Sequence, residues 1–285
     1  MPRQRNLAAW LGSALGTLCA LTLLAAPGQA WDHPEKLTEE FHQTYTLTPE
    51  GRVALENING AVHIMAWDKD EVQVDAVKYA NSKERLDQAK IEVSAGKDSV
   101  SIHTEYPHHD NNWNLLGRDN PASVEYTLTV PRHARLDEIK LINGSLDIQG
   151  VAGEVRASCI NGRLSAHGLH GPAELSNING RTEAEFARVK DSIELSSVNG
   201  SVELTLPSDS QARLEASTVH GGIHNDFGLR VNNHNWVGHD LSGDLGKGGT
   251  EIKLSNVNGG IEIHRASDGR QLSTPKDLSG NDDEL

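Results

Sequence analysis

Two clusters of histidine and aspartate side chains are the first candidates for metal chemistry in this 285-residue chain. Imidazole and carboxylate groups are common ligands of zinc and other transition metals. Neither cluster has the spacing of a helical zinc motif, and neither supplies a closed set of four ligands. We therefore expect solvated loop side chains, no resident metal and no cofactor. The clusters contain His103, His108, His109 and Asp110, and His234, His239 and Asp240.

Two tryptophans, Trp113 and Trp236, stand in polar segments rich in Asn and His. A flat indole face can stack on a sugar ring, while neighbouring amides bind its hydroxyl groups. The pattern is therefore typical of glycan recognition. The alternative is that each indole only fastens its segment to the rest of the protein.

Glutamates recur at equivalent positions of an internal repeat. Glu174, Glu194 and Glu215 share one position, and Glu183 and Glu203 share another. If the repeats stack as parallel strands, equivalent side chains lie about 4.8 Å apart, and each like-charged pair costs some tenths of a kcal/mol. Hydrophobic burial can outweigh that cost, whereas bound Ca²⁺ or a basic partner would relieve it. We therefore take Glu174, Glu194 and Glu215, together with the two tryptophans, as candidate residues of a surface that binds a partner.

The sequence contains no Gly-x-Ser-x-Gly motif, no phosphate loop and no Cys/His pair at a recognisable spacing. Some β-solenoids are polysaccharide lyases or hydrolases with paired carboxylates in a groove, and such an enzyme is the alternative function. The repeat already explains the acidic pairs, so we predict a protein without catalytic residues. Cys159 is in phase with the repeat and is expected to be a small core residue.

A recurring Asn-Gly dipeptide defines the elements that must position these residues. From Asn143 to His220 the intervals between equivalent positions are 18, 18, 20 and 21 residues, a period typical of stacked repeats. A β-branched residue precedes every copy. The repeated position is occupied by Asn59, Asn143, Asn161, Asn179, Asn199 and Asn258, with His220 as a variant.

Apolar and polar residues alternate on both sides of each Asn-Gly, which predicts two short strands per repeat with one buried face. Asn tolerates positive φ, and Gly favours it, at the corner between the strands. A meander of antiparallel hairpins would have the same period, but columns of identical residues favour parallel coils. One such column, three residues before the repeated position, contains Ser158, Ser176, Ser196, Ser217 and Ser255. We therefore predict an all-β fold, a parallel β-solenoid resembling a single-stranded β-helix, with coils of 18–21 residues over 136–265.

The segments outside this region are less regular. Residues 31–135 predict a first coil and a small α+β cap, with a short helix over 81–89 and a hairpin over 91–104, which would protect the edge of the stack. The polar residues 266–285 are expected to be disordered.

Residues 1–30 have the features of a signal peptide: Arg3 and Arg5, an apolar stretch over 7–24, and a small-x-small pattern before Trp31. An uncleaved membrane anchor is the alternative. We expect a bacterial exported protein, periplasmic, on the cell surface or secreted, without membrane insertion after cleavage because no second apolar stretch could span a bilayer. The net charge of −14 becomes −16 when Arg3 and Arg5 are removed, which argues against nucleic acid and anionic lipid as partners.

Several segments resemble a bacterial envelope family of β-solenoid proteins that carries the label "putative adhesin" and has no assigned function. The resemblance covers about residues 45–265 and implies parallel coils and an extracytoplasmic location. It supplies no catalytic motif. The matching segments are residues 53–60, 66–72 and 126–131, the Asn-Gly coils, and residues 248–259.

The sequence therefore predicts a non-enzymatic, exported β-solenoid that acts as an adhesin-like or scaffold and binding module in the cell envelope. The expected partner is an envelope glycan or protein. Self-association through the edges of the coils is also expected, because an uncovered strand edge can pair with another copy.

Overall fold

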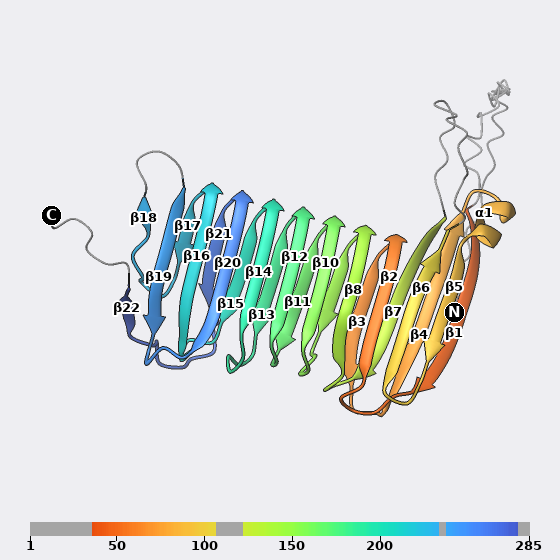
Figure 1. The fold of residues 1–285 in the computed structure, drawn as a ribbon, viewed down its shortest axis with the longest axis horizontal. Coiled ribbons are helices and arrows are strands. Elements are labelled where there is room, and N and C mark those ends of the chain that lie inside the picture. Colours follow the sequence, from red (N-terminus) through yellow and green to blue (C-terminus); the bar gives the residue numbers. More distant parts are fainter. Residues whose placement is uncertain (1–35, 107–121, 234–237, 279–285) are drawn as a thin grey trace, which may run out of the picture. The chain divides into compact units, whose positions relative to one another are not determined.

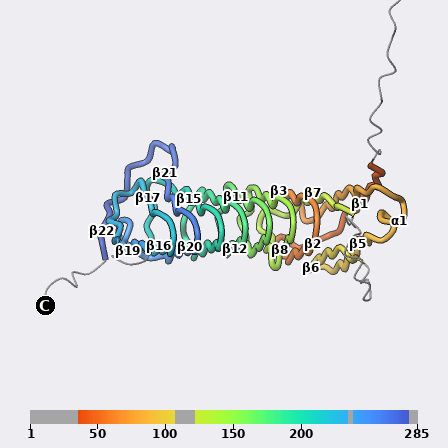
Figure 2. The backbone as a smooth tube through the Cα atoms, turned by 90° about the horizontal axis from the view of Figure 1, so that it is seen from above, coloured from red at the N-terminus to blue at the C-terminus, as the bar shows by residue number. Residues whose placement is uncertain are grey.

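The computed structural model describes residues 36–106, 122–233 and 238–278. Nearly all of its regular structure is β-strand, arranged in two sheets that we call sheet A and sheet B. Figure 1 shows the strands side by side, and Figure 2 shows the chain coiling repeatedly around the space between the two sheets. In the described part of the chain, no helix is long and apolar enough to cross a bilayer.

The strand order differs between the two sheets. In spatial order, sheet A contains β1 (Leu37–Thr46), β4 (Glu71–Ala80), β7 (Ser123–Pro131), β3 (Val62–Trp67), β9 (Leu146–Gln149), β11 (Leu164–Leu169), β13 (Thr182–Phe186), β15 (Val202–Leu206), β21 (Ile261–Arg265) and β17 (Ile223–Asn225). Sheet B contains β18 (Asn232–Asn233), β19 (His239–Leu245), β16 (Ala212–His220), β20 (Thr250–Asn258), β14 (Ile193–Asn199), β12 (Ala173–Asn179), β10 (Val155–Asn161), β8 (Arg135–Asn143), β2 (Arg52–Asn59), β6 (Ser99–Glu105) and β5 (Lys90–Ala95), and β22 (Pro275–Asp277) pairs with β19.

Each coil contributes one strand to each sheet, and the coils stack in parallel and in register. Ala173 of β12 lies beside Val155 of β10 and Ile193 of β14, and Leu175 likewise lies beside Leu195. The alternating apolar residues of both sheets face each other and are almost completely buried. The parallel solenoid is therefore confirmed, and the antiparallel meander is wrong for the repeat region.

The side chains of the repeated asparagines form a continuous hydrogen-bonded row along the corner of the stack. The amide Nδ2 of Asn161 donates to Oδ1 of Asn143 at 2.9 Å, and Asn179 donates to Asn161 at 2.8 Å. The same contact joins Asn143 to Asn59, Asn199 to Asn179, and Asn258 to Asn199. His220 occupies this position in the terminal coil, beside Asn258. Each asparagine thus fixes the register of its neighbour.

The glycine after each asparagine is required because neighbouring corners nearly touch. A Cβ on Gly180 would collide with the carbonyl oxygen of Gly162, and the φ of Gly180 is +138°. Only glycine fits this combination of positive φ and close backbone approach without strain.

A buried polar column holds the same corner from inside. Nδ2 of Asn177 donates to the carbonyl oxygen of Gly162 at 2.9 Å, and Asn256 donates to that of Gly200 at 2.7 Å. Cys159 occupies this column, is 1% exposed, and its thiol lies 3.6 Å from the carbonyl oxygen of Gly144. Burial raises the pKa of this thiol. Cys159 is therefore a core residue, as predicted.

The last two coils do not stack in the order of the sequence. Strand β20 lies between β14 and β16, and β21 lies between β15 and β17. The coil at 212–225 is therefore outermost, and the chain returns to insert residues 250–265 inside it. This corrects the expectation that successive windows pile up in sequence order.

The first coil, β2–β3, stacks directly on β8–β9, although more than sixty residues separate them in the sequence. The residues between them form β4, α1 (Lys83–Gln88), the β5–β6 hairpin and β7, which extend both sheets beyond the first coil. Ser82 caps α1 by accepting a hydrogen bond from the backbone of Arg85.

At the other end, β18 and β19 cover the edge of β16, and residues beyond the last coil pack across it. Strand β22 pairs with β19, Ser273 is 8% exposed, and its hydroxyl donates to the carbonyl oxygen of Ser210. Asp268 accepts hydrogen bonds from the hydroxyl and the backbone of Ser208, which lower the pKa of Asp268 to about 2. The expectation of disorder is thus wrong for residues 266–278, and residues 279–285 lie outside the described part.

The corner glycines give a direct test of the stacking geometry. We expect Gly180→Ala to destabilise the protein by more than about 1 kcal/mol, because the new Cβ meets a neighbouring carbonyl group at positive φ. In thermal unfolding, each kcal/mol corresponds to a shift of about 2–4 °C. Gly222→Ala is the matched control, since a Cβ there meets no atom within 4 Å. Equal shifts for the two variants would contradict the close approach of the corners.

The inserted coil predicts which strands lose protection together. Leu254→Ala removes a fully buried side chain from β20 and should cost about 2–5 kcal/mol. Because β20 separates β14 from β16, hydrogen exchange should accelerate in β16, which precedes it in sequence. Leu146→Ala, an equally buried deletion in β9, should accelerate exchange around β9 while β16 stays protected. Slow exchange in β16 of the Leu254→Ala variant would contradict the insertion.

Candidate functional site

The outer face of sheet B carries three side-chain rows that run along the stack, and we call it the ladder face. One row is aliphatic and stands immediately before the asparagine row. Six of its members are large apolar side chains with close to 40% of their surface exposed, an unusual density for a solvent-facing sheet. In spatial order the row contains Ile58, Ile142, Ile160, Ile178, Val198, Val257 and Val219.

The middle row of the ladder face is made of hydroxyl groups. Its serines are those of the column that the sequence revealed, and they are partly or fully exposed beside the aliphatic row. At one end the row continues into Lys140 and Glu56, which form an ion pair at 3.1 Å. Apolar contact and hydroxyl hydrogen bonding are thus offered side by side.

The third row contains the predicted glutamates, but it also contains the basic residues Arg156 and Lys253. Glu174 lies next to Glu194, as expected. On the neighbouring strands, Lys253 lies beside Glu194 on one side and beside Glu215 on the other. At the other side, Arg156 lies 3.6 Å from Glu174. An unbroken row of the three glutamates is therefore wrong, because the inserted strand β20 brings a lysine between two of them.

The apolar row ends in a groove of about 380 Å³ on sheet B. Its floor includes Ile58, Ile142 and Ile160, and its wall includes Thr104 of β6. His103 pairs with Glu56 at 3.2 Å on its rim. Three isoleucines line this groove, so it is a suitable point for an apolar group of a ligand to bind.

The remaining residues predicted for function are not brought together in the described structure. Trp113 and Trp236 lie outside the described residues, as do His108, His109, Asp110 and His234. His103 belongs to the groove on sheet B, whereas His239 contacts Asn233 at 2.6 Å in the terminal hairpin. The glycan hypothesis for the tryptophans stays a prediction.

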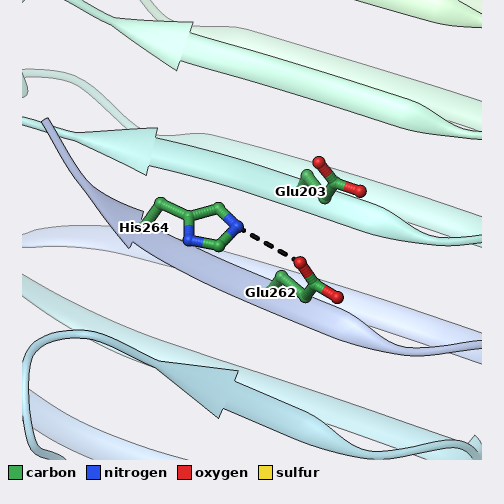
Figure 3. Close-up of side chains that lie close together, drawn as sticks. All are labelled: Glu203, Glu262 and His264. Atoms are coloured by element: carbon green, nitrogen blue, oxygen red, sulfur yellow. Dashed lines mark hydrogen bonds and ion pairs between the residues drawn. The ribbon is translucent and has the colours of Figure 1, made fainter.

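A separate polar cluster lies on the outer face of sheet A. Figure 3 shows Glu203 on β15 and Glu262 and His264 on β21, with their side chains close together. One potential ligand atom from each lies within 4.8 Å of the others, and Nε2 of His264 is 3.2 Å from Glu262. A carboxylate–carboxylate–imidazole set of this kind can hold a divalent cation.

This cluster already contains an internal cation. The guanidinium of Arg181 forms a close ion pair with Glu203 and lies 3.8 Å from Glu183. The carboxylate of Glu203 raises the pKa of Arg181. His264 also faces Asp226 at 3.4 Å, and the pKa of Asp226 is lowered mainly by the backbone N–H of Arg265 and also by His264. Ion pairing within the protein therefore accounts for the cluster, and no chemical step is derived from it.

The family comparison assigns the repeats. Residues 137–264 match the family model described as Toastrack DUF4097. These residues extend from β8 to β21. The repeat region is similar to the Toastrack family. The predicted resemblance to a putative-adhesin family is thereby confirmed, and the first coil lies outside the matched residues.

Two of the solved structures that this chain matches are described as adhesion proteins. A putative cell adhesion protein from Clostridium sporogenes is 13% identical with a TM-score of 0.46, and the alignment covers 80% of this chain and 100% of that one. A putative adhesin from Bacteroides fragilis is 11% identical with a TM-score of 0.34, over 80% of this chain and 97% of that one. At these TM-scores neither likeness carries an argument about function. The search of curated proteins finds no match.

The aliphatic row is the feature that sequence reasoning missed. A β-branched residue before every Asn-Gly was visible in the sequence, but the strand alternation alone does not say which of two neighbouring apolar positions turns outward. The signal that could have found it is the phase: the exposed row lies one residue away from the buried polar column, so it must face the other side of the sheet.

Removing the internal cation of the sheet A cluster gives a sharp test. Arg181→Gln leaves Glu183, Glu203 and Glu262 without their guanidinium and should lower the free energy of unfolding by about 0.2–1 kcal/mol. Added CaCl₂ should then restore the melting temperature more than NaCl of equal ionic strength. Arg188→Gln, which removes the same charge from the turn after β13, should show no such difference. Equal effects of both salts on Arg181→Gln would contradict a shared carboxylate site.

Proposed function

We propose that this protein is a non-enzymatic, adhesin-like binding module of the bacterial cell envelope, and that the ladder face is its binding surface. The observation that carries the proposal is the exposed aliphatic row. Soluble proteins rarely expose a continuous apolar strip of this length without a partner. The predicted signal peptide at 1–30 supports an exported, periplasmic or surface location.

The ladder face favours an extended, repeating ligand, and an envelope glycan has suitable chemistry. Sugar rings present C–H faces that pack on aliphatic side chains, and their hydroxyls can bond to the neighbouring serines and asparagines. Each coil offers the same set of groups at a spacing of about 4.8 Å. Many weak, equivalent contacts along the stack would then add up to useful affinity.

The proposal contains no catalytic step. On sheet B the carboxylates are interleaved with Arg156 and Lys253, and on sheet A they are paired with Arg181 and His264. These carboxylates are engaged by cations within the protein, so the proposal assigns none of them a role as general acid or nucleophile. The alternative of a polysaccharide-active enzyme is left to the experiment.

The test is an array of bacterial envelope glycans probed with the purified protein. We expect binding to at least one glycan class, and Ile178→Lys should weaken it at least about tenfold because it places a charge in the centre of the aliphatic row. Met65→Lys is the matched control, since it adds the same charge to an equally exposed apolar position on sheet A.

Each outcome of this experiment has a clear meaning. Equal loss of binding in both variants, or no binding to any glycan, would contradict the assignment of the ladder face. Release of shorter oligosaccharides from a bound glycan would contradict a non-enzymatic module. Trp113→Ala and Trp236→Ala test the separate prediction that the indoles take part.

A further inference from the structure

Sheet A ends in a long strand with an uncovered edge. All ten residues of β1 pair with β4, from Leu37 beside Ala80 to Thr46 beside Glu71. Among the described residues, no strand pairs with the opposite edge of β1. By contrast, the far ends of the two sheets finish in β17, with three residues, and β18, with two. Short terminal strands protect a sheet from edge pairing, and β1 lacks this protection.

The inner face of β1 is also incompletely covered. Beyond the first coil, sheet A adds three strands (β7, β4 and β1), whereas sheet B adds only two (β6 and β5). Sheet B therefore ends one strand earlier. As a result Leu37 is 42% exposed, and Phe41 and Tyr45 are only partly buried against the core. Figure 1 shows α1 near this end, where it contacts β1 and β4.

The sequence of β1 is nearly self-complementary about Phe41. If two copies of the strand run antiparallel with Phe41 opposite the partner's Phe41, four kinds of favourable pair form, and Glu39 meets the partner's Gln43. On the inner face, Leu37 meets the partner's Tyr45, and two phenylalanines meet at the centre. On the outer face, Thr38 meets the partner's Thr44, and Glu40 meets the partner's His42. Aromatic, threonine and opposite-charge pairs are the cross-strand pairs that stabilise antiparallel sheets.

The surroundings of His42 are acidic. Its ring lies 2.8 Å from Asp75 and 3.3 Å from Glu40, and these carboxylates raise the pKa of His42, Asp75 more than Glu40. Both His42 and Glu40 keep more than half of their side-chain surface exposed, so another strand can reach them.

The hydrogen-bonding pattern is compatible as well. On an edge strand, alternate residues point their backbone N–H and C=O groups outward. Centring on Phe41 pairs odd-numbered residues with odd and even with even. A residue whose N–H and C=O groups point away from β4 therefore always lies opposite a partner residue with the same orientation, so the two strands can exchange backbone hydrogen bonds.

We propose that this protein forms a two-fold symmetric dimer in which β1 pairs antiparallel with β1 of a second copy, centred on Phe41. The pairing would join two copies of sheet A into one continuous sheet and cover the partly exposed Leu37, Phe41 and Tyr45 on the inner face of β1. The contact is isologous, so it closes as a dimer and does not propagate. It does not depend on the proposed function, because the ladder face lies on sheet B.

The oligomeric state is the first test. Analytical ultracentrifugation of the purified protein over a wide concentration range should show a monomer–dimer equilibrium. Phe41→Lys should raise the dimer dissociation constant at least about tenfold, because two lysines meet at the axis. Met65→Lys and Ile178→Lys, which add the same charge elsewhere, should leave it unchanged. A monomer at every concentration would overturn the proposal, as would equal weakening by all three substitutions.

Cysteine crosslinking tests the register and does not depend on the size of the central side chain. Cys159 is buried and is replaced by alanine in the parent protein, which must retain its fold. Oxidation of an equimolar mixture of Glu40→Cys and His42→Cys chains should give a disulfide-linked heterodimer, because the two positions are directly opposite. Thr44→Cys alone should not crosslink, because its own copy lies six residues along the partner strand, about 20 Å away.

The crosslinking outcomes separate pairing from chance collision. A heterodimer from the mixture, with no product from Thr44→Cys, supports the stated register. Efficient crosslinking of Thr44→Cys, or none in the mixture, would overturn it. Loss of glycan binding in Ile178→Lys with an intact dimer would leave this proposal standing, so the two proposals fail independently.

Discussion

The fold depends on one constraint: the backbones of neighbouring coils approach so closely at the Asn-Gly corner that no side chain fits between them. A Cβ on most corner glycines would overlap the carbonyl oxygen of the next glycine. Outside this contact, the asparagine amides hydrogen-bond from coil to coil, and inside it the buried polar column binds the same glycine carbonyls. The corner admits only one register. The remaining residues of a coil are therefore aligned with their equivalents in the next coil.

The same register has opposite consequences on the two faces of a sheet. Inward, equivalent aliphatic side chains stack into a continuous core, which no single coil could form alone. On the outer face, the common register repeats the exposed side chains of each coil as rows of aliphatic, hydroxyl or charged groups. A surface of identical groups at constant spacing is therefore a by-product of stability, and it suits recognition of a repeating partner better than the chemistry of a single site. Stacking of like charges also has a cost. In the polar cluster around Glu203, the neighbouring carboxylates are balanced by the guanidinium of Arg181.

The two ends of the stack are treated differently. At the C-terminal end, the chain inserts its last coil beneath the preceding one, adds an antiparallel hairpin and packs residues 266–278 across the edge. At the other end, sheet A ends in a ten-residue strand whose outer edge has no strand beside it in the described part of the chain. A parallel stack has no intrinsic stop, so its ends must be covered by other structure or by another molecule. The C-terminal end of the stack is therefore protected, whereas the end formed by β1 is suited to association.

The sequence by itself determined the coil: two strands, the corner between them, the buried rows and the place of Cys159. These features repeat with a short period and follow from local rules of alternation and positive φ, so each is visible within about twenty residues. Only the tertiary structure decided the order of the coils. Whether the coil after residue 206 stacks next or last depends on contacts between segments far apart in sequence, and no periodic pattern encodes that choice. That order placed Lys253 between Glu194 and Glu215 and so interrupted the predicted acidic row.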